Sequence, residues 1–546
     1  MQSPPSGHPS ARADLVLFGD IVTMHEALPR ADALAVRDGR IVAVGDRSSV
    51  EPLVGAGTRT VDLGDACVLP GFIEPHGHPL EEAVVLGPAI VDIRPVTVSD
   101  ADAVVRTVHE TVAARGEAGA TLNGWDPLLQ KGLPIPTLDW LDSVAPRHPL
   151  VILHNSGHVA YFNSAAATRA GITRDTPEPV GGSYGRNGTG DLDGSAYEVP
   201  AVFAVAGAAL TPGDNLAELL SAECARLNAA GITTIAEMSF DPRLRPALAA
   251  VAASGALTTR LRLYEMSTAA LTSEASPGDG DDLVRQVGIK VWSDGSPWVG
   301  NIATRFPYLD TEATRGLGIA CSHGHANYTG EQIHDITSAY FGKGWQLACH
   351  AHGDEAITMV LDAWERVLHE QPRPDHRLRL EHVGAMRPDQ FRRAAELGVT
   401  VSIFVDHLHY WGDVLVDDLF GPEHGGAWAA AGSALAAGQR FSFHNDGPVT
   451  PANPLRNIAD AVTRRTPSGR VAAPDERIPV AAALRAQTVD AAWQLFDEDS
   501  IGSLFPGAYA DLVVLSGNPL DTAPAALTGL EIRATVLEGR TVYGAL

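Results

Sequence analysis

The sequence predicts an α/β protein built around a (β/α)₈ TIM-type barrel, with a small β-sandwich domain formed by both termini and an insertion subdomain after the first barrel strand. Three observations support this fold class. Apolar, β-branched runs alternate with helical stretches through the middle of the chain, and short β-patterns occur at both ends. A turn-rich stretch from about residue 91 to residue 194 exceeds what a minimal barrel needs.

The two ends of the chain carry similar β-patterns. In the first, Asp38-Gly39 is a hairpin signal. Because two β-rich ends flank a long α/β middle, we expect residues 14–68 and 500–546 to pair into one domain. Residues 1–13, rich in Pro, Ser and Gly, are expected to form a disordered N-terminal tail. The β-patterns span residues 14–18, 34–37 and 40–45 at the start and 510–515, 535–537 and 540–543 at the end.

The middle of the chain contains eight apolar runs that are candidate strands of a parallel sheet. Helical patterns lie between several of them, for example at residues 216–230 and 354–370. The barrel is expected to span residues 69–499, with the insertion at about 91–194 covering its mouth and a long loop at 409–438. The candidate strands are 68–73, 150–154, 232–237, 288–292, 346–350, 378–382, 399–404 and 440–444.

The charge and composition of the chain limit the classes of molecule that it is expected to bind. The 546 residues carry a formal net charge of −26, which argues against binding to nucleic acid or to an anionic membrane surface. The sequence has no apolar run of about 18 residues, so we expect no membrane span. The N-terminus lacks the apolar core of a signal peptide, and a cytoplasmic location is therefore expected. A small-molecule substrate is the expected partner.

The strongest chemical signal is His76-Gly77-His78, which ends the first candidate barrel strand. Alternate side chains of an extended strand point the same way, so both imidazoles can face one metal ion. Three further clusters end later candidate strands. The first contains His350 and His352, the second contains His382, and the third contains Asp446. Neutral imidazole and carboxylate suit Zn²⁺ and related divalent cations.

Lys290 ends another buried apolar run, where an unpaired charge is costly. Two interpretations remain open. Lys290 either pairs with Asp294 or another carboxylate, or serves the site, for example as a metal ligand after carboxylation by CO₂. An unmodified ammonium group offers only donors and cannot be a ligand.

These motifs resemble the amidohydrolase superfamily, in particular the branch of N-substituted formamide deformylases and YtcJ-like proteins. The resemblance covers nearly the whole chain from about residue 14. The segments that carry it are PGFIEPHGH, NSGHVAYFNSAAA, GITTIAEM, GIKVWSDGS, HAHGDEAI, RLEHV, FHNDGPV and GSLFPGAYADLVVLSGNPL.

The resemblance implies a role for individual residues. Metal ligands would be His76, His78, His350, His382 and Asp446, with Lys290 as the position that can be carboxylated to bridge two ions. Asp446 would be the catalytic acid and base, and His350 would help to stabilise the oxyanion. Substrate contacts would come from His158, Asn163, His352, His407 and Trp292. His352 departs from the family pattern, which has one histidine in this motif, and His407 is equally compatible with an ordinary loop histidine.

The function expected from this resemblance is metal-dependent cleavage of a C–N bond in an amide or N-substituted formamide. Zn²⁺ is the expected cofactor, as one or two ions, with Mn²⁺ or Fe²⁺ as alternatives. Hydrolysis of a cyclic amide, ester or lactone, or a deamination, is the second hypothesis, and a non-catalytic binding protein is the third. A homodimer is expected because the family is often dimeric.

Overall fold

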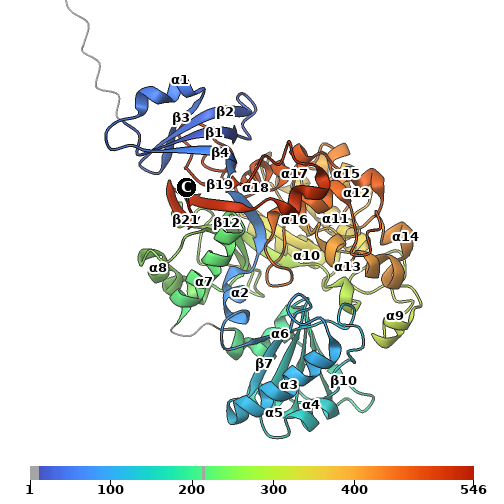
Figure 1. The fold of residues 1–546 in the computed structure, drawn as a ribbon. Helices are drawn as coiled ribbons and strands as arrows, with labels where there is room; N and C mark the ends of the chain where they lie inside the picture. Colours follow the sequence, from blue (N-terminus) through green and yellow to red (C-terminus); the bar gives the residue numbers. More distant parts are fainter. Residues whose placement is uncertain (1–11, 212–214) are drawn as a thin grey trace, which may run out of the picture.

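The centre of the fold is an eight-stranded parallel sheet that curves into a nearly closed barrel (Figure 1). The computed structural model describes residues 12–211 and 215–546, so the expected tail at residues 1–13 falls almost entirely outside the described residues. The barrel predicted from the sequence is confirmed. Its strands are β5 Phe72–Gly77, β12 Ile232–Phe240, β13 Arg260–Met266, β14 Val284–Trp292, β15 Gln346–Ala351, β16 Arg379–His382, β17 Thr400–Ile403 and β18 Phe441–Phe443.

The first and last barrel strands meet through two hydrogen bonds near their carboxyl ends. The His78 backbone N–H donates to the Gly447 carbonyl at 3.0 Å. The Asn445 backbone N–H donates to Glu74 Oε1 at 3.1 Å. These bonds hold the segment after β18 against the end of β5, and they thereby bring two distant motifs of the sequence together.

The strand prediction was wrong at two places. Residues 150–154 form β8 Leu150–His154, which belongs to the insertion, because a short apolar run fits any buried strand equally well. The strand β13 was missed because it alternates arginine with leucine. Arg260 and Arg262 are buried and pair with Asp511 at 2.7 Å and Asp497 at 2.5 Å, so their charges are compensated by residues far away in the sequence.

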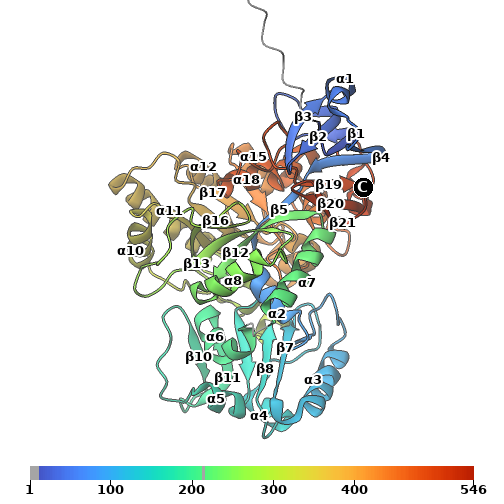
Figure 2. The ribbon, with the colours of Figure 1, turned by 90° about the vertical axis from the view of Figure 1, so that its left-hand side faces the viewer.

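Both ends of the chain contribute to a single seven-stranded sheet with the order β21-β20-β19-β4-β1-β2-β3. Side chains from the two ends share one apolar cluster, in which Leu17 and Leu34 pack with Leu512 and Val514. This sheet and the insertion lie at opposite ends of the molecule, with the barrel between them (Figure 2). The strands are β1 Leu15–Val22, β2 Arg30–Arg37, β3 Arg40–Gly45, β4 Arg59–Pro70, β19 Leu512–Leu515, β20 Ile532–Leu537 and β21 Arg540–Gly544.

The insertion has a six-stranded sheet of its own, in the order β10-β11-β9-β8-β7-β6. Figure 1 shows it below the barrel, with α6 on the side that faces the barrel. Its elements are β6 Val91–Asp92, α3 Ala101–Arg115, β7 Ala120–Trp125, α4 Leu138–Val144, β8, β9 Val159–Phe162, α5 Ser164–Ala170, β10 Ser183–Arg186, β11 Leu192–Tyr197 and α6 Glu198–Leu210.

Helices cover the outside of the barrel. The helix predicted at 354–370 is α11 Asp354–Glu370, and the stretch expected as a loop at 409–438 is instead largely helical. Among the described residues, no helix has the length and hydropathy needed to cross a membrane. The remaining α-helices of six or more residues are α2 Pro79–Val85, α7 Leu216–Ala229, α8 Arg245–Ala253, α10 Gly330–Phe341, α12 Pro388–Glu396, α13 His407–Val414, α15 Ala431–Ala436, α16 Pro454–Thr463, α17 Val480–Ala486 and α18 Val489–Gln494.

Candidate active site and metal centre

Side chains from the carboxyl ends of the barrel strands gather in one pocket. His76, Lys290, His350, His382 and Asp446 all line it. They come from β5, β14, β15, β16 and the segment after β18, which are far apart along the chain. In barrels of this type the active site lies at this end of the strands, so the pocket is the candidate active site.

Asp446 faces two imidazole nitrogens in this pocket. Its Oδ1 lies 3.3 Å from His76 Nε2 and 3.3 Å from His78 Nε2. Among the described residues, this buried oxygen has no hydrogen-bond partner. Two imidazole nitrogens and a carboxylate oxygen that converge without satisfying one another fit a divalent cation such as Zn²⁺.

The charges of Asp446 and His78 depend on each other. Burial opposes ionisation of Asp446, but His76 and His78 hold its pKa well below its usual range. Burial likewise opposes protonation of His78, yet Asp446 and Glu237 raise its pKa to about 10. His78 therefore carries a proton in the metal-free protein, and a bound cation would displace it.

Partners on the far side of each imidazole orient the two rings. His76 Nδ1 donates to Glu381 Oε2 at 2.5 Å, and His78 Nδ1 lies 2.8 Å from Ser239 Oγ. Burial opposes ionisation of Glu381, but the Arg379 guanidinium keeps its pKa below the usual range. Because Nδ1 donates to Glu381, the neutral form of His76 has the lone pair of Nε2 free, as a metal ligand requires.

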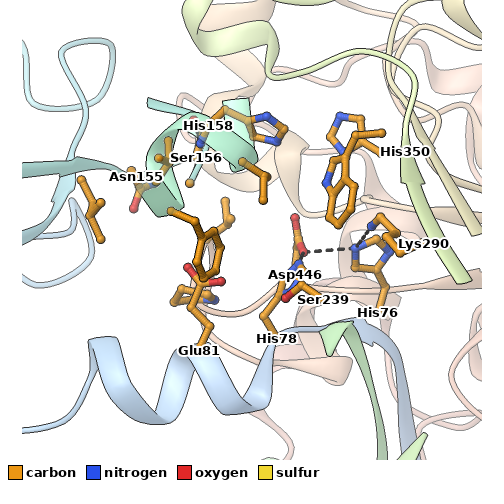
Figure 3. Close-up of a pocket in the computed structure, with 18 of the residues that line it drawn as sticks. His76, His78, Glu81, Asn155, Ser156, His158, Ser239, Lys290, His350 and Asp446 are labelled. Atoms are coloured by element: carbon orange, nitrogen blue, oxygen red, sulfur yellow. Dashed lines mark hydrogen bonds and ion pairs between the residues drawn. The ribbon is translucent and has the colours of Figure 1, made fainter. Parts of the chain in front are cut away.

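Lys290 lies fully buried on β14, with Nζ 2.9 Å from His76 Nε2. Figure 3 shows this contact beside the contact between His76 and Asp446. Burial lowers the pKa of Lys290 to about 8. A substantial fraction of the amine is therefore neutral near pH 8, and the neutral amine is the form that reacts with CO₂.

A second group of imidazoles lies next to the first. The ligand nitrogens of His350, His352 and His382 all lie within 4.8 Å of one another. Burial lowers the pKa of each ring well below its usual value, so all three are neutral, as metal ligation requires. His350 Nε2 also lies 2.9 Å from the Gly295 carbonyl, and His382 Nδ1 lies 3.0 Å from His444 Nε2.

Two residues of the site have strained backbones. His382 has φ 70° and Asp446 has φ 56°, in the left-handed region that non-glycine residues rarely adopt. Each such residue costs roughly 1–3 kcal/mol and persists only where the surrounding structure holds it. The strain turns both residues sharply at their strand ends and supports a functional role for them.

The insertion supplies the opposite wall of the pocket. His158, Ser156 and Asn155 lie across from His76 and Lys290 (Figure 3). His158 Nδ1 donates to Glu198 Oε2 at 2.7 Å. Burial opposes protonation of His158, but the Glu198 carboxylate raises its pKa above the usual value. Glu198 therefore favours the protonated form of His158 on the wall that faces the metal-binding groups.

Three residues expected to contact substrate do not line this pocket. Asn163 is fully buried as the N-cap of α5, where its side chain bonds the backbone of Leu150 and Ala166. His407 accepts a hydrogen bond from Trp428 Nε1 at 3.1 Å, and its ring stacks on that of His352. His352 is buried among aromatic rings and stacks on His382. Asn163 is thus a structural cap, His352 packs against His382, and His407 packs against His352. Trp292 and His158 do line the pocket.

Sequence reasoning missed several residues of the site. Glu381 stands in the RLEHV motif beside His382, but strand alternation places neighbouring side chains on opposite faces, which hid its contact with His76. Ser239 and Glu198 carry no recognisable pattern in the sequence, because each acts on a histidine from a different element.

Comparisons with known proteins agree with this geometry. The model of the amidohydrolase family matches residues 59–543. The chain is 29% identical to Protein LONG AFTER FAR-RED 3 of Arabidopsis thaliana, over 99% of this chain and 93% of that protein. It is 27% identical to an N-substituted formamide deformylase of Arthrobacter pascens, over 97% of this chain and 98% of that enzyme.

The fold is shared with a solved structure, an uncharacterized metal-dependent hydrolase from Pyrococcus horikoshii OT3. The two structures superpose with a TM-score of 0.73 at 22% sequence identity, covering 94% of this chain and 99% of the other. Because the family model matches most of the sequence, from the terminal sheet through the whole barrel, the assignment does not depend on any single relative. The chain belongs to the amidohydrolase family.

Proposed function

We propose that this chain is a metal-dependent hydrolase that cleaves the C–N bond of an amide, in particular an N-substituted formamide. The observation that carries the proposal is the approach of Asp446 Oδ1 to His76 Nε2 and His78 Nε2, each at 3.3 Å, at the bottom of a pocket. The full-length similarity to an enzyme named N-substituted formamide deformylase supports the bond type.

We infer two positions for cations from the donor set. His76, His78 and Asp446 would hold one ion, and His350 and His382 would hold a second, with carboxylated Lys290 between them. Imidazole and carboxylate ligands suit Zn²⁺, with Mn²⁺ and Fe²⁺ as the alternatives. When bound, such a cation lowers the pKa of water and polarises a carbonyl group.

The protein's own residues would then move the proton. Asp446 accepts a proton from the attacking water and returns it to the nitrogen as the C–N bond breaks. An amine leaves poorly until it is protonated, so one carboxyl group that takes and returns the proton suits this reaction. His158, held by Glu198, presents positive charge to the carbonyl oxygen from the insertion side, and His350 aids this stabilisation from β15.

The experiment that tests this function is a substrate panel. Purified protein is stripped of metal, reloaded with Zn²⁺ or Mn²⁺, and assayed on N-formyl amines, N-acyl amines, cyclic amides, lactones and aminated heterocycles. Release of a primary amine from the N-formyl or N-acyl compounds, only with metal restored, is expected. Turnover confined to lactones or aminated heterocycles contradicts the bond assignment, and equal activity without metal contradicts the metal dependence.

A further inference from the structure

A second cavity opens beside the candidate active site, and we name it the side pocket. It has a volume of about 720 Å³ and lies between α6 of the insertion, the ends of β13 and β14, and α10. Pro200, Met266, Leu271 and Ile336 give it an apolar lining. An apolar cavity of about 150 Å³ already accepts benzene, so the side pocket has room for a much larger group.

The side pocket adjoins the metal-binding groups. Val199, Phe203 and Trp292 line both it and the candidate active site, so the two cavities share a wall. Trp292 also lies next to the metal-binding groups, because Lys290 Nζ is 5.1 Å from the centre of its ring. The side pocket therefore adjoins the cavity that contains Asp446, where the reactive carbonyl of a substrate would lie.

The described lining of the side pocket offers no basic partner to an anion. Among the described lining residues there is no lysine or arginine, so a carboxylate or phosphate finds no basic partner. Glu198 is already engaged by His158 and by Asn301 Nδ2, which donates to it at 2.9 Å. Asp335 is exposed at the rim, where water solvates it. The remaining contact surface favours an uncharged hydrocarbon group.

We propose that the side pocket is a specificity subsite that binds an aryl group or a medium-length alkyl chain carried by the amide substrate. This inference rests on the proposed hydrolase function and adds the class of substituent that the enzyme selects. The hydrocarbon group moves out of water and into the side pocket while the amide lies at the metal-binding groups. Burial of this group therefore raises kcat/KM.

Two substrate series test the proposal. In one, the nitrogen substituent of a formamide lengthens from methyl to hexyl. In the other, the acyl group of an N-methylamide lengthens from formyl to hexanoyl. In at least one series, kcat/KM rises by up to about fourfold for each added CH₂. Values that stay flat in both series overturn the proposal while leaving the proposed function intact.

Substitutions at two adjacent loop residues test whether the dependence of kcat/KM on substituent length arises in the side pocket. Ala269 lines the side pocket and Ala270 does not, and both are exposed in the loop after β13. Ala269→Trp fills the side pocket and lowers the ratio of kcat/KM for the hexyl and methyl substrates at least tenfold, whereas Ala270→Trp leaves that ratio unchanged. Ile336 lines the side pocket from α10, and Ile336→Ser makes this part of the lining polar. We expect it to lower the same ratio. Equal ratios in all variants overturn the proposal.

A binding measurement separates this inference from the proposed function. 4-Phenylbutan-1-ol, titrated into the metal-loaded protein in a calorimeter, is expected to bind and to bind at least tenfold more weakly to Ala269→Trp. If the alcohol binds in this way but the protein hydrolyses no amide, the side pocket is supported as an apolar binding site and the proposed function is refuted. An absence of binding to the unsubstituted protein refutes the side pocket.

Discussion

Lys290 Nζ lies 2.9 Å from His76 Nε2, the same nitrogen that lies 3.3 Å from Asp446 Oδ1. The amine of Lys290 and the carboxylate of Asp446 thus converge on one nitrogen of one imidazole. Of the interpretations of Lys290 drawn from the sequence, pairing with Asp294 finds no support in this contact, whereas the carboxylates of Glu381 and Asp446 do act on its amine and raise its pKa against the effect of burial. The contact instead supports a role for Lys290 within the metal-binding group.

Removal of the Lys290 amine should deplete the metal. Carboxylation of the neutral amine gives a carboxylate that can bridge two cations, and Lys290→Ala removes that group. We expect metal content, measured by plasma mass spectrometry, to fall by at least half, with partial recovery of activity on addition of acetate or propionate. Lys131→Ala, at an exposed lysine of the insertion, is the control. Normal metal content and no effect of added carboxylate would instead favour a purely structural role.

Asp446→Asn should separate metal binding from proton transfer. The amide oxygen of asparagine keeps a ligand atom in place, but asparagine cannot accept the proton of water at neutral pH. We expect kcat to fall at least about a thousandfold, which lies within the usual range for a general acid–base residue, while metal content changes little. Asp175→Asn, at an exposed residue, should behave like the unsubstituted protein. Activity that survives in Asp446→Asn shows that another residue moves the proton.

Ser239 contacts His78, one of the proposed metal ligands, on the side of the ring away from Asp446. Its Oγ lies 2.8 Å from His78 Nδ1, so Ser239→Ala frees the ring to rotate. Loss of such an outer partner typically weakens metal binding about 10- to 100-fold. Competition with a fluorescent zinc chelator measures this change, and the thermal midpoint of the metal-free protein should stay within experimental error. Ser143→Ala, on the exposed side of α4, is the matched control. If Ser239→Ala binds zinc as tightly as the unsubstituted protein, Ser239 does not orient His78 for metal binding.

Glu198 should set the pH range of the enzyme through His158. Glu198 raises the pKa of His158, so the imidazolium persists at pH values above the ordinary histidine pKa. In Glu198→Gln the ring loses its charge at a lower pH, and the alkaline limb of the kcat/KM profile should therefore move to lower pH. The stabilisation that the raised pKa contributes is fully present below the ordinary pKa and is lost as pH rises through the raised value.

The control for this experiment is Glu218→Gln, at an exposed residue of α7. It should keep the alkaline limb where the unsubstituted protein has it. If Glu198→Gln lowers kcat/KM equally at every pH, Glu198 acts only as a structural link between the insertion and the barrel, through its bond from Asn301. The displaced limb is therefore the decisive observation.

The sequence by itself determined the barrel and most of the residues in the candidate active site. His76, His350 and His382 are recognisable because each stands at the carboxyl end of an apolar run, and apolar runs are read from local composition. The helix at 354–370 was predicted to the residue because its apolar face repeats with helical period. Asp446 follows the last apolar run in the same way, and the FHNDGPV motif supplied its expected role.

Only the tertiary structure decided which side chains meet. The strand that contains Arg260 was missed in the sequence, because its partner Asp511, which follows it by 251 positions, neutralises it inside the protein. Asn163 looked like a substrate residue until its bonds to neighbouring backbone showed it to be a helix cap. Glu381, Ser239 and Glu198 act on histidines of other elements. Such contacts depend on how separate strands close into a barrel, and no local pattern of sequence records that closure.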